Sequence, residues 1–221
     1  MTSPRPVSLP TLCGFLVAAF GVSATLLLLK PLAPPGQLTD AYVIMRELAL
    51  FAVTGLLLLI VVLGEKRGLD SLGLHGRHWG RAAVSSLLIY LVCMAVAIAC
   101  SGLSQALGFK EGVPFAGYRN VSAWTMTLIM VRAGVVEEIC YRGYLMERLE
   151  QFNRHWSISL LLPAAFFGLL HYAQGPRGIL IAFGVGLVLG LAYRRTCDLK
   201  ANILAHFLID FIANVLPRLL H

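Results

Sequence analysis

Long apolar runs recur along almost the whole chain, and they decide what it can fold into. A helix needs about 20 mainly apolar residues, within a range of about 17–25, to cross the ~30 Å hydrocarbon core of a bilayer. The runs that reach or approach this length are 12–29, 42–64, 82–102, 122–146, 156–174, 177–195 and 200–217. Inside lipid, a helix satisfies its backbone polar groups within its own segment. The predicted fold class is therefore all-α, a polytopic membrane helix bundle of about seven transmembrane helices.

Composition agrees with a membrane protein. Hydrophobic residues make up 58% of the 221 positions and charged residues 13%, whereas roughly 25% of the residues in an ordinary globular domain are charged. The connections are short and contain Pro and Gly, as in PLAPPGQ at 31–37. We expect a single integral membrane domain over 1–221, with N-terminal helices at 12–102. The basic segment 68–81 is predicted to lie on the membrane surface.

Membrane topology explains the net charge of +7. The basic residues cluster in short loops and form no stripe with interleaved aromatics, so we expect the lipid bilayer and no nucleic acid as a partner. Their distribution favours a cytoplasmic N-terminus, with Arg46 counted among the few basic residues of the outer side. Lys30 ends the first run, which is longer than the ~7–15 apolar residues of a signal peptide. We therefore expect that run to be a retained helix.

Polar side chains interrupt three of the later runs, where a charged group costs about 2.5–3.5 kcal/mol near the bilayer centre. They are Arg132, Glu137, Glu138 and Arg142 in 122–146, His171 in 156–174, and His206, Asp210 and Asn214 in 200–217. Interhelical polar contacts in membranes average only about 0.6 kcal/mol, so stability alone does not account for three such sets. We expect a polar intramembrane cavity lined by Glu137, His171, His206 and Asp210.

Helical spacing shows which charged residues of the run 122–146 share a face of the helix. Glu138 and Arg142 are four residues apart, share a face of an α-helix and stand in the order that favours an ion pair. Glu137 is rotated by about 100° from its neighbour Glu138. The spacing therefore predicts a structural pair, Glu138 with Arg142, and leaves Glu137 unpaired.

Glutamate together with histidine is suited to activating water. One group removes the proton of the water, and a second polar group stabilises the charge that develops on the attacked carbonyl. The same side chains could ligate zinc, with Glu137, His171 and His206 as ligands. The HExxH signature of zinc peptidases is absent, as are the GxGD and GxSG motifs of other intramembrane proteases. No metal or other cofactor is favoured, and zinc remains the possible one.

Three motifs in this order resemble those of a known family. EEICYR matches EExxxR, FGLLH matches FxxxH, and HFLID matches HxxxN with Asp210 in place of the asparagine. Together they resemble the CPBP family of intramembrane proteases, also called the Abi or CAAX-protease family, which includes the Rce1-type prenyl-protein endopeptidases. The resemblance covers roughly 122–214 and implies a catalytic core at about 122–217.

The resemblance also implies catalytic roles. Glu137 would be the catalytic glutamate that activates water, assisted by His171. His206 would stabilise the oxyanion together with the residue at position 210. An ionised carboxylate cannot donate a hydrogen bond to an oxyanion, so Asp210 would have to be protonated, orient His206 or support a metal. Asn214, one turn further on, is the alternative source of an amide.

Supporting roles follow from the same resemblance. Glu138 and Arg142 would hold the first motif in place, and Phe167 would pack beside His171. One difficulty is depth: if helices begin at their charged flanks, Glu137 and His171 differ by on the order of 10 Å along the membrane normal. The run 156–174 would then begin deeper, tilt or be shorter than it looks.

The expected function is that of an intramembrane endopeptidase, a hydrolase that cuts a peptide or protein substrate near the membrane. The short loops and the DSLGL sequence at 70–74 resemble bacterial members, so the expected location is a bacterial inner membrane. Two alternatives stay open: a non-catalytic membrane immunity or regulatory protein, and a proton-coupled transporter. Natural substrate and oligomeric state are not indicated.

Overall fold

The computed structural model describes residues 7–75, 79–110, 112, 116–153 and 155–220, and this part of the chain contains helices and connections without any strand. The helices are α1 Leu9–Leu29, α2 Asp40–Leu59, α3 Trp79–Ala106, α4 Ala123–Arg132, α5 Glu147–Asn153, α6 Trp156–Leu170, α7 Gly175–Thr196, α8 Leu199–Asn214 and α9 Leu216–Leu220. Two π-helical segments, Ala133–Glu137 and Ile139–Met146, join α4 to α5.

The predicted all-α membrane bundle is confirmed. Four helical stretches are long and apolar enough to cross a membrane, namely Leu9–Leu32, Asp40–Gly64, Trp79–Ala106 and Tyr172–Thr196, and the apolar α6 is shorter. The helical stretch that begins with α4 carries the charged residues singled out above, and α8 is shorter, with 16 residues. These two stretches, which carry most of the predicted site residues, are therefore not among the long apolar ones.

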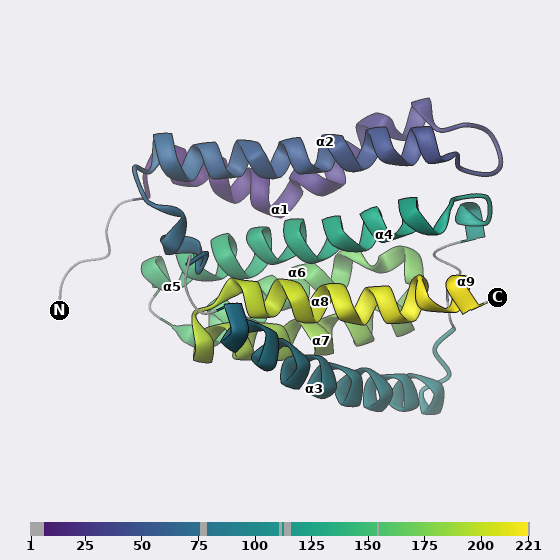
Figure 1. Cartoon of the computed structure of the whole chain (residues 1–221). Coiled ribbons are helices and arrows are strands. Elements are labelled where there is room, and N and C mark those ends of the chain that lie inside the picture. The colour runs from purple at the N-terminus through teal and green to yellow at the C-terminus, as the bar shows by residue number, and fades with distance from the viewer. Residues whose placement is uncertain (1–6, 76–78, 111, 113–115, 154, 221) are drawn as a thin grey trace.

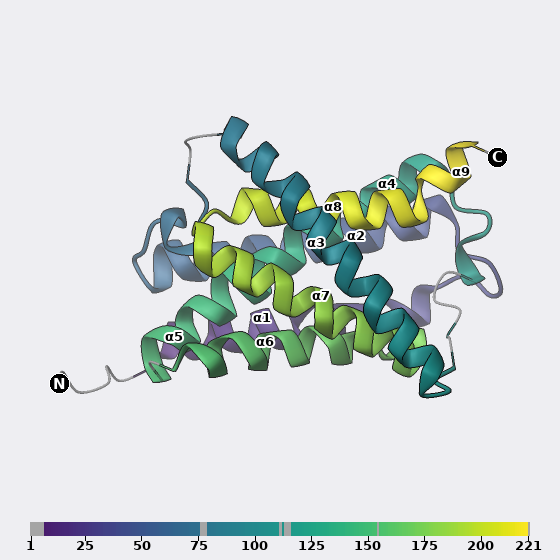
Figure 2. The ribbon, with the colours of Figure 1, turned by 90° about the horizontal axis from the view of Figure 1, so that it is seen from below.

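The helices form layers around the polar ones. α1 and α2 pack as an antiparallel hairpin on one side of the bundle, and α3 lies on the opposite side (Figure 1). α3 crosses α7 and α8 obliquely (Figure 2) and packs against both. α4, α6 and α8 lie between the two outer layers (Figure 1). The polar helices are thereby covered from both sides.

Sequence signals mark several helix starts. Ser8, Thr39 and Ser122 stand at the N-caps of α1, α2 and α4, and each side-chain oxygen accepts a hydrogen bond from a backbone N–H three residues on. Such caps satisfy donors that a helix start otherwise leaves unpaired.

The segment 68–81, which is predicted to lie on the membrane surface, is attached to the bundle through its described residues. Leu69–Leu72 forms one short 3₁₀ turn, and Leu72 is fully buried. Gly73 follows with a positive φ of 75°, and its carbonyl accepts a hydrogen bond from the Leu199 N–H at 3.0 Å. The turn is thus anchored to the start of α8. Its place on the membrane surface stays a prediction, and 76–78 fall outside the described residues.

A buried ion pair closes the same end of the bundle. Arg148 in α5 donates to Glu65, just after the helical stretch of α2, at 2.7–2.9 Å. The Tyr144 hydroxyl lies 2.7 Å from Glu65 and 3.2 Å from the Thr11 carbonyl of α1. Burial raises the pKa of Glu65, but the hydrogen bonds from Arg148 and Tyr144 outweigh burial, so its pKa lies below the ordinary value. This cluster ties the α1–α2 hairpin to the segment that carries the first motif.

Candidate active site

The first motif lies in π-helical backbone. Glu137 ends the segment Ala133–Glu137, and Arg142 lies inside Ile139–Met146. π-helical turns are rare and occur often at functional sites. Gly134 lets this segment approach α8 closely, because a Cβ there would come within 3.0 Å of the Ile203 carbonyl and 3.2 Å of the Phe207 nitrogen. The motif is therefore pressed against the helix that carries His206.

The predicted pair of Glu138 and Arg142 is confirmed. Arg142 Nη1 donates to Glu138 Oε1 at 2.5 Å, and both side chains are buried. Arg142 also donates to the Gly186 carbonyl of α7 at 3.1 Å, and Asn202 of α8 donates to Glu138 Oε2 at 3.1 Å. This pair therefore links the first motif to α7 and α8, as a structural support would.

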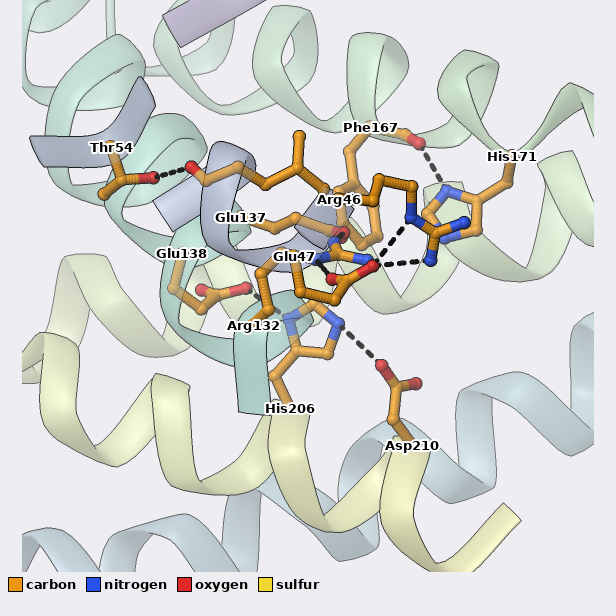
Figure 3. A network of polar contacts seen from close by, with 11 residues as sticks. Arg46, Glu47, Thr54, Arg132, Glu137, Glu138, Phe167, His171, His206 and Asp210 are labelled. Carbon is orange, nitrogen blue, oxygen red and sulfur yellow. Dashed lines mark hydrogen bonds and ion pairs between the residues drawn. The ribbon is translucent and has the colours of Figure 1, made fainter. Parts of the chain in front are cut away.

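His206 lies between two carboxylates (Figure 3). Its Nδ1 is 2.9 Å from Glu138 Oε1, and its Nε2 is 3.6 Å from Asp210 Oδ2. A carboxylate only accepts, so Nδ1 carries a hydrogen. Sequence reasoning found the stripe of His206, Asp210 and Asn214 but missed Asn202, which extends it by one more step of four residues. That spacing was the available signal.

Glu137 is paired, so the prediction that it stands unpaired is wrong. Arg132 Nη1 donates to Glu137 Oε1 at 2.9 Å. The two residues are five positions apart, which on an α-helix separates them by about 140°, whereas the i→i+5 period of a π-helix brings such positions together. Among the described residues, Glu137 Oε2 has no hydrogen-bond partner. One oxygen is held and the other is left for a further contact.

Sequence reasoning also missed a second layer of charges behind Glu137. Glu47 of α2 accepts from Arg132 Nε at 2.5 Å and from Arg46 Nε at 2.8 Å. Arg46 donates in turn to the Tyr118 hydroxyl at 2.6 Å. Arg46, which the sequence places among the basic residues of the outer side, lies inside α2 and its side chain is buried. The only sequence signal was an adjacent Arg and Glu within an apolar run.

Helix α6 is shorter than the predicted run 156–174, which is one of the three explanations offered for the difference in depth. This helix has only 15 residues, and His171 stands at its C-cap. His171 Nδ1 lies 2.8 Å from the Phe167 carbonyl, and the two rings are 4.8 Å apart. The Phe167 ring also lies 5.7 Å from the His206 ring and 4.7 Å from the Arg142 guanidinium carbon. Phe167 thus packs beside His171, as predicted, and connects it to His206.

The exposed fraction of the side chains increases across the site, from Glu138 to Asp210. The Glu138 side chain is 0% exposed and that of His206 is 5% exposed, while Glu137 is 16% and Asp210 28% exposed. Glu137, His171 and Arg132 are all close enough to Asp210 to interact with it electrostatically. The side of the site at Asp210 is therefore the one most open to an incoming molecule.

Two of the predicted roles do not fit the structure: Asn214 as the source of the amide, and zinc binding by three side chains of the site. The Asn214 amide donates to the Asp210 backbone carbonyl at 2.9 Å, so it does not take the place of the motif's asparagine. Within the described residues, no three His, Cys, Asp or Glu side chains are arranged to hold a metal ion. The zinc set of Glu137, His171 and His206 therefore does not fit this geometry, and we derive no step through a metal.

The fold and these residues define a polytopic membrane protein with a carboxylate and imidazole site between its helices. Residues 119–212 match the family model described as Rce1-like, the type II CAAX prenyl endopeptidases. This match confirms the resemblance to the CPBP family and includes all three motifs. The family is a peptidase family, which supports a peptidase activity in general. No curated protein and no solved structure matches the chain significantly.

Proposed function

We propose that this protein is an intramembrane endopeptidase in which Glu137 activates water to hydrolyse a peptide bond near the membrane. One observation carries the proposal: Arg132 holds one oxygen of the Glu137 carboxylate, and the other oxygen has no partner among the described residues. A base needs a free lone pair in a fixed direction, and this arrangement supplies one beside His206, Asp210 and His171.

In this mechanism, Glu137 Oε2 takes a proton from water as the oxygen of the water attacks the substrate carbonyl. The same proton can then pass to the leaving amine. His171 Nδ1 donates to a carbonyl, which leaves its Nε2 as the ring atom that can orient the water. Glu137 and His171 thus act on the nucleophile.

His206 acts on the developing oxyanion. Its Nδ1–H is taken by Glu138, so the group that can reach a substrate is Nε2. When the imidazole carries a hydrogen on both nitrogens, Nε2–H donates a hydrogen bond to the oxyanion. Asp210 orients this ring and is displaced from it by the oxyanion of the intermediate. Preorganised donors of this kind typically contribute about 10²–10³-fold to the rate.

The proposal also includes the kind of substrate and the side from which it reaches the site. We expect a peptide or the tail of a membrane protein that reaches the site from the Asp210 side, in a bacterial inner membrane with the N-terminus of this chain cytoplasmic. The residues of the site do not select one sequence of peptide.

The test uses the purified full chain in proteoliposomes with a library of internally quenched peptides. Wild type should cleave members of the library, and Glu137→Gln or His206→Ala should lower the rate by about 10²–10⁴-fold. Activity that survives both substitutions would contradict the proposal. Activity that is lost on adding a zinc chelator would replace the metal-free mechanism by a metal-dependent one.

A further inference from the structure

We infer that Glu47 of α2 is a positioning residue, which sets the orientation of Glu137 through Arg132. The inference rests on the proposed function, because it gives Glu47 a part in the same water-activating site. Glu47 lies outside the residues 119–212 that match the family model. It belongs to a helix whose length and composition are those of a plain membrane span.

A single guanidinium connects the two carboxylates. Arg132 Nε donates to Glu47 Oε2 at 2.5 Å, and Arg132 Nη1 donates to Glu137 Oε1 at 2.9 Å. The guanidinium is planar and its donors form a rigid fork. A bond that fixes Nε therefore also fixes the direction in which Nη1 points at Glu137.

Glu47 is itself held on both oxygens. Its Oε1 accepts from Arg46 and its Oε2 from Arg132, and the side chain is 0% exposed. Arg46 in turn donates a hydrogen bond to the Tyr118 hydroxyl, which restricts its movement. The anchor of Arg132 is thus a carboxylate that has little freedom to rotate.

This anchor has a chemical consequence for Glu137. Arginine commonly binds a carboxylate through two parallel hydrogen bonds, which would engage both oxygens. In this structure the bond from Nε to Glu47 holds the guanidinium in an orientation from which it donates to Glu137 through a single bond, from Nη1 to Oε1. Glu47 therefore keeps Glu137 Oε2 available to water.

The four charges of Arg46, Glu47, Arg132 and Glu137 cancel, and the variants must respect this balance. Glu47→Gln alone leaves a buried positive charge, which can prevent folding. The double variant Arg46→Gln with Glu47→Gln removes one charge of each sign and still weakens the anchor of Arg132, because a neutral amide oxygen holds a guanidinium less firmly than a carboxylate does. It therefore keeps the test valid if the single variant does not fold.

The experiment measures kcat and KM for the best-cleaved peptide of the quenched library, with the full chain in proteoliposomes. Glu47→Gln and the charge-balanced double variant should lower kcat by about 10- to 100-fold with little change in KM, because the base is misplaced while binding is kept. Arg132→Gln should lower kcat similarly. Adding Glu47→Gln to Arg132→Gln should cause no further loss, since Glu47 acts through Arg132.

The matched control is Glu65→Gln, which removes another buried glutamate paired with an arginine but outside the site. It should lower the thermal midpoint and leave kcat unchanged. A wild-type kcat in the charge-balanced variant, or losses from Glu47→Gln and Arg132→Gln that multiply, would overturn the inference alone. A wild-type protein that cleaves no peptide, or an active Glu137→Gln, would overturn the proposed function and the inference with it.

Discussion

At the scale of single residues, Asp210 is where this chain departs from the HxxxN motif of the family that it resembles. Its carboxylate lies 3.6 Å from His206 Nε2, and its side chain is 28% exposed. In the mechanism above it orients the imidazole but cannot donate to an oxyanion. An asparagine at this position would add the missing donor.

We predict that Asp210→Asn keeps or raises kcat, because an amide oxygen can still accept from His206 and the amide N–H adds a donor for the oxyanion. Asp210→Leu, which removes both functions at similar volume, should lower kcat by about tenfold or more. The measurement is kcat for both variants on the same peptide. Equal losses in the two would mean that the negative charge itself is required.

The sequence predicted some of the site residues and their pairing, and the exceptions have a physical cause. Glu138 with Arg142 was predicted correctly, because its bond survives the change from α- to π-helical backbone. The pairing of Glu137 with Arg132 was missed, because α-helical spacing places these residues on different faces. Glu47 could not be found by spacing at all, since its partner comes from another helix.

At the scale of elements, the contact between the π-helical segment Ala133–Glu137 and α8 determines how close Glu137 comes to His206 and Asp210. Gly134 makes this approach possible, because an added Cβ would come within 3.0–3.2 Å of backbone atoms of α8. A side chain at this position would therefore push α8 away from the segment.

We predict that Gly134→Val destabilises the protein by about 1–3 kcal/mol, as overpacking does elsewhere, and also lowers kcat. Gly55→Ala on α2 is the control, because a Cβ at Gly55 meets nothing within 4 Å. Thermal unfolding in detergent, followed by tryptophan fluorescence, measures the first effect and peptide cleavage the second. A Gly134→Val protein as stable and active as Gly55→Ala would refute this account of the contact.

Most elements were predictable because apolar runs of membrane length leave few alternatives to helix. The predicted run 156–174 is longer than the helix, because α6 ends at Leu170 and a short 3₁₀ turn follows His171. In the segment 68–81, the basic residues indicated a membrane surface, but they gave no sign that Leu72 is buried in the bundle. Which polar residues meet across helices depends on packing and could not be inferred from composition.

At the scale of the whole molecule, the cluster of Glu65, Arg148 and Tyr144 joins the α1–α2 hairpin to the rest of the bundle. The pKa of Glu65 is lowered in the folded state. Its contribution to stability is therefore present above the pKa of the unfolded chain and is lost as pH falls through the folded pKa.

We predict that the thermal midpoint of the wild type falls steeply below about pH 4.5, while Glu65→Gln is less stable at neutral pH and shows a shallower fall. The measurement is the midpoint in detergent between about pH 3 and pH 7. Identical slopes for wild type and variant would show that Glu65 does not contribute to the acid sensitivity.

The central claim is that the carboxylate of Glu137 is the base that activates water, and a single-turnover cleavage rate in proteoliposomes tests it most directly. Glu137→Gln keeps the size of the side chain and an oxygen that can accept from Arg132, but removes the basic carboxylate. Glu150→Gln, which changes an exposed glutamate paired with Arg194, is the control. The account predicts a loss of about 10²–10⁴-fold for Glu137→Gln and none for Glu150→Gln. Equal rates in the two variants would contradict it.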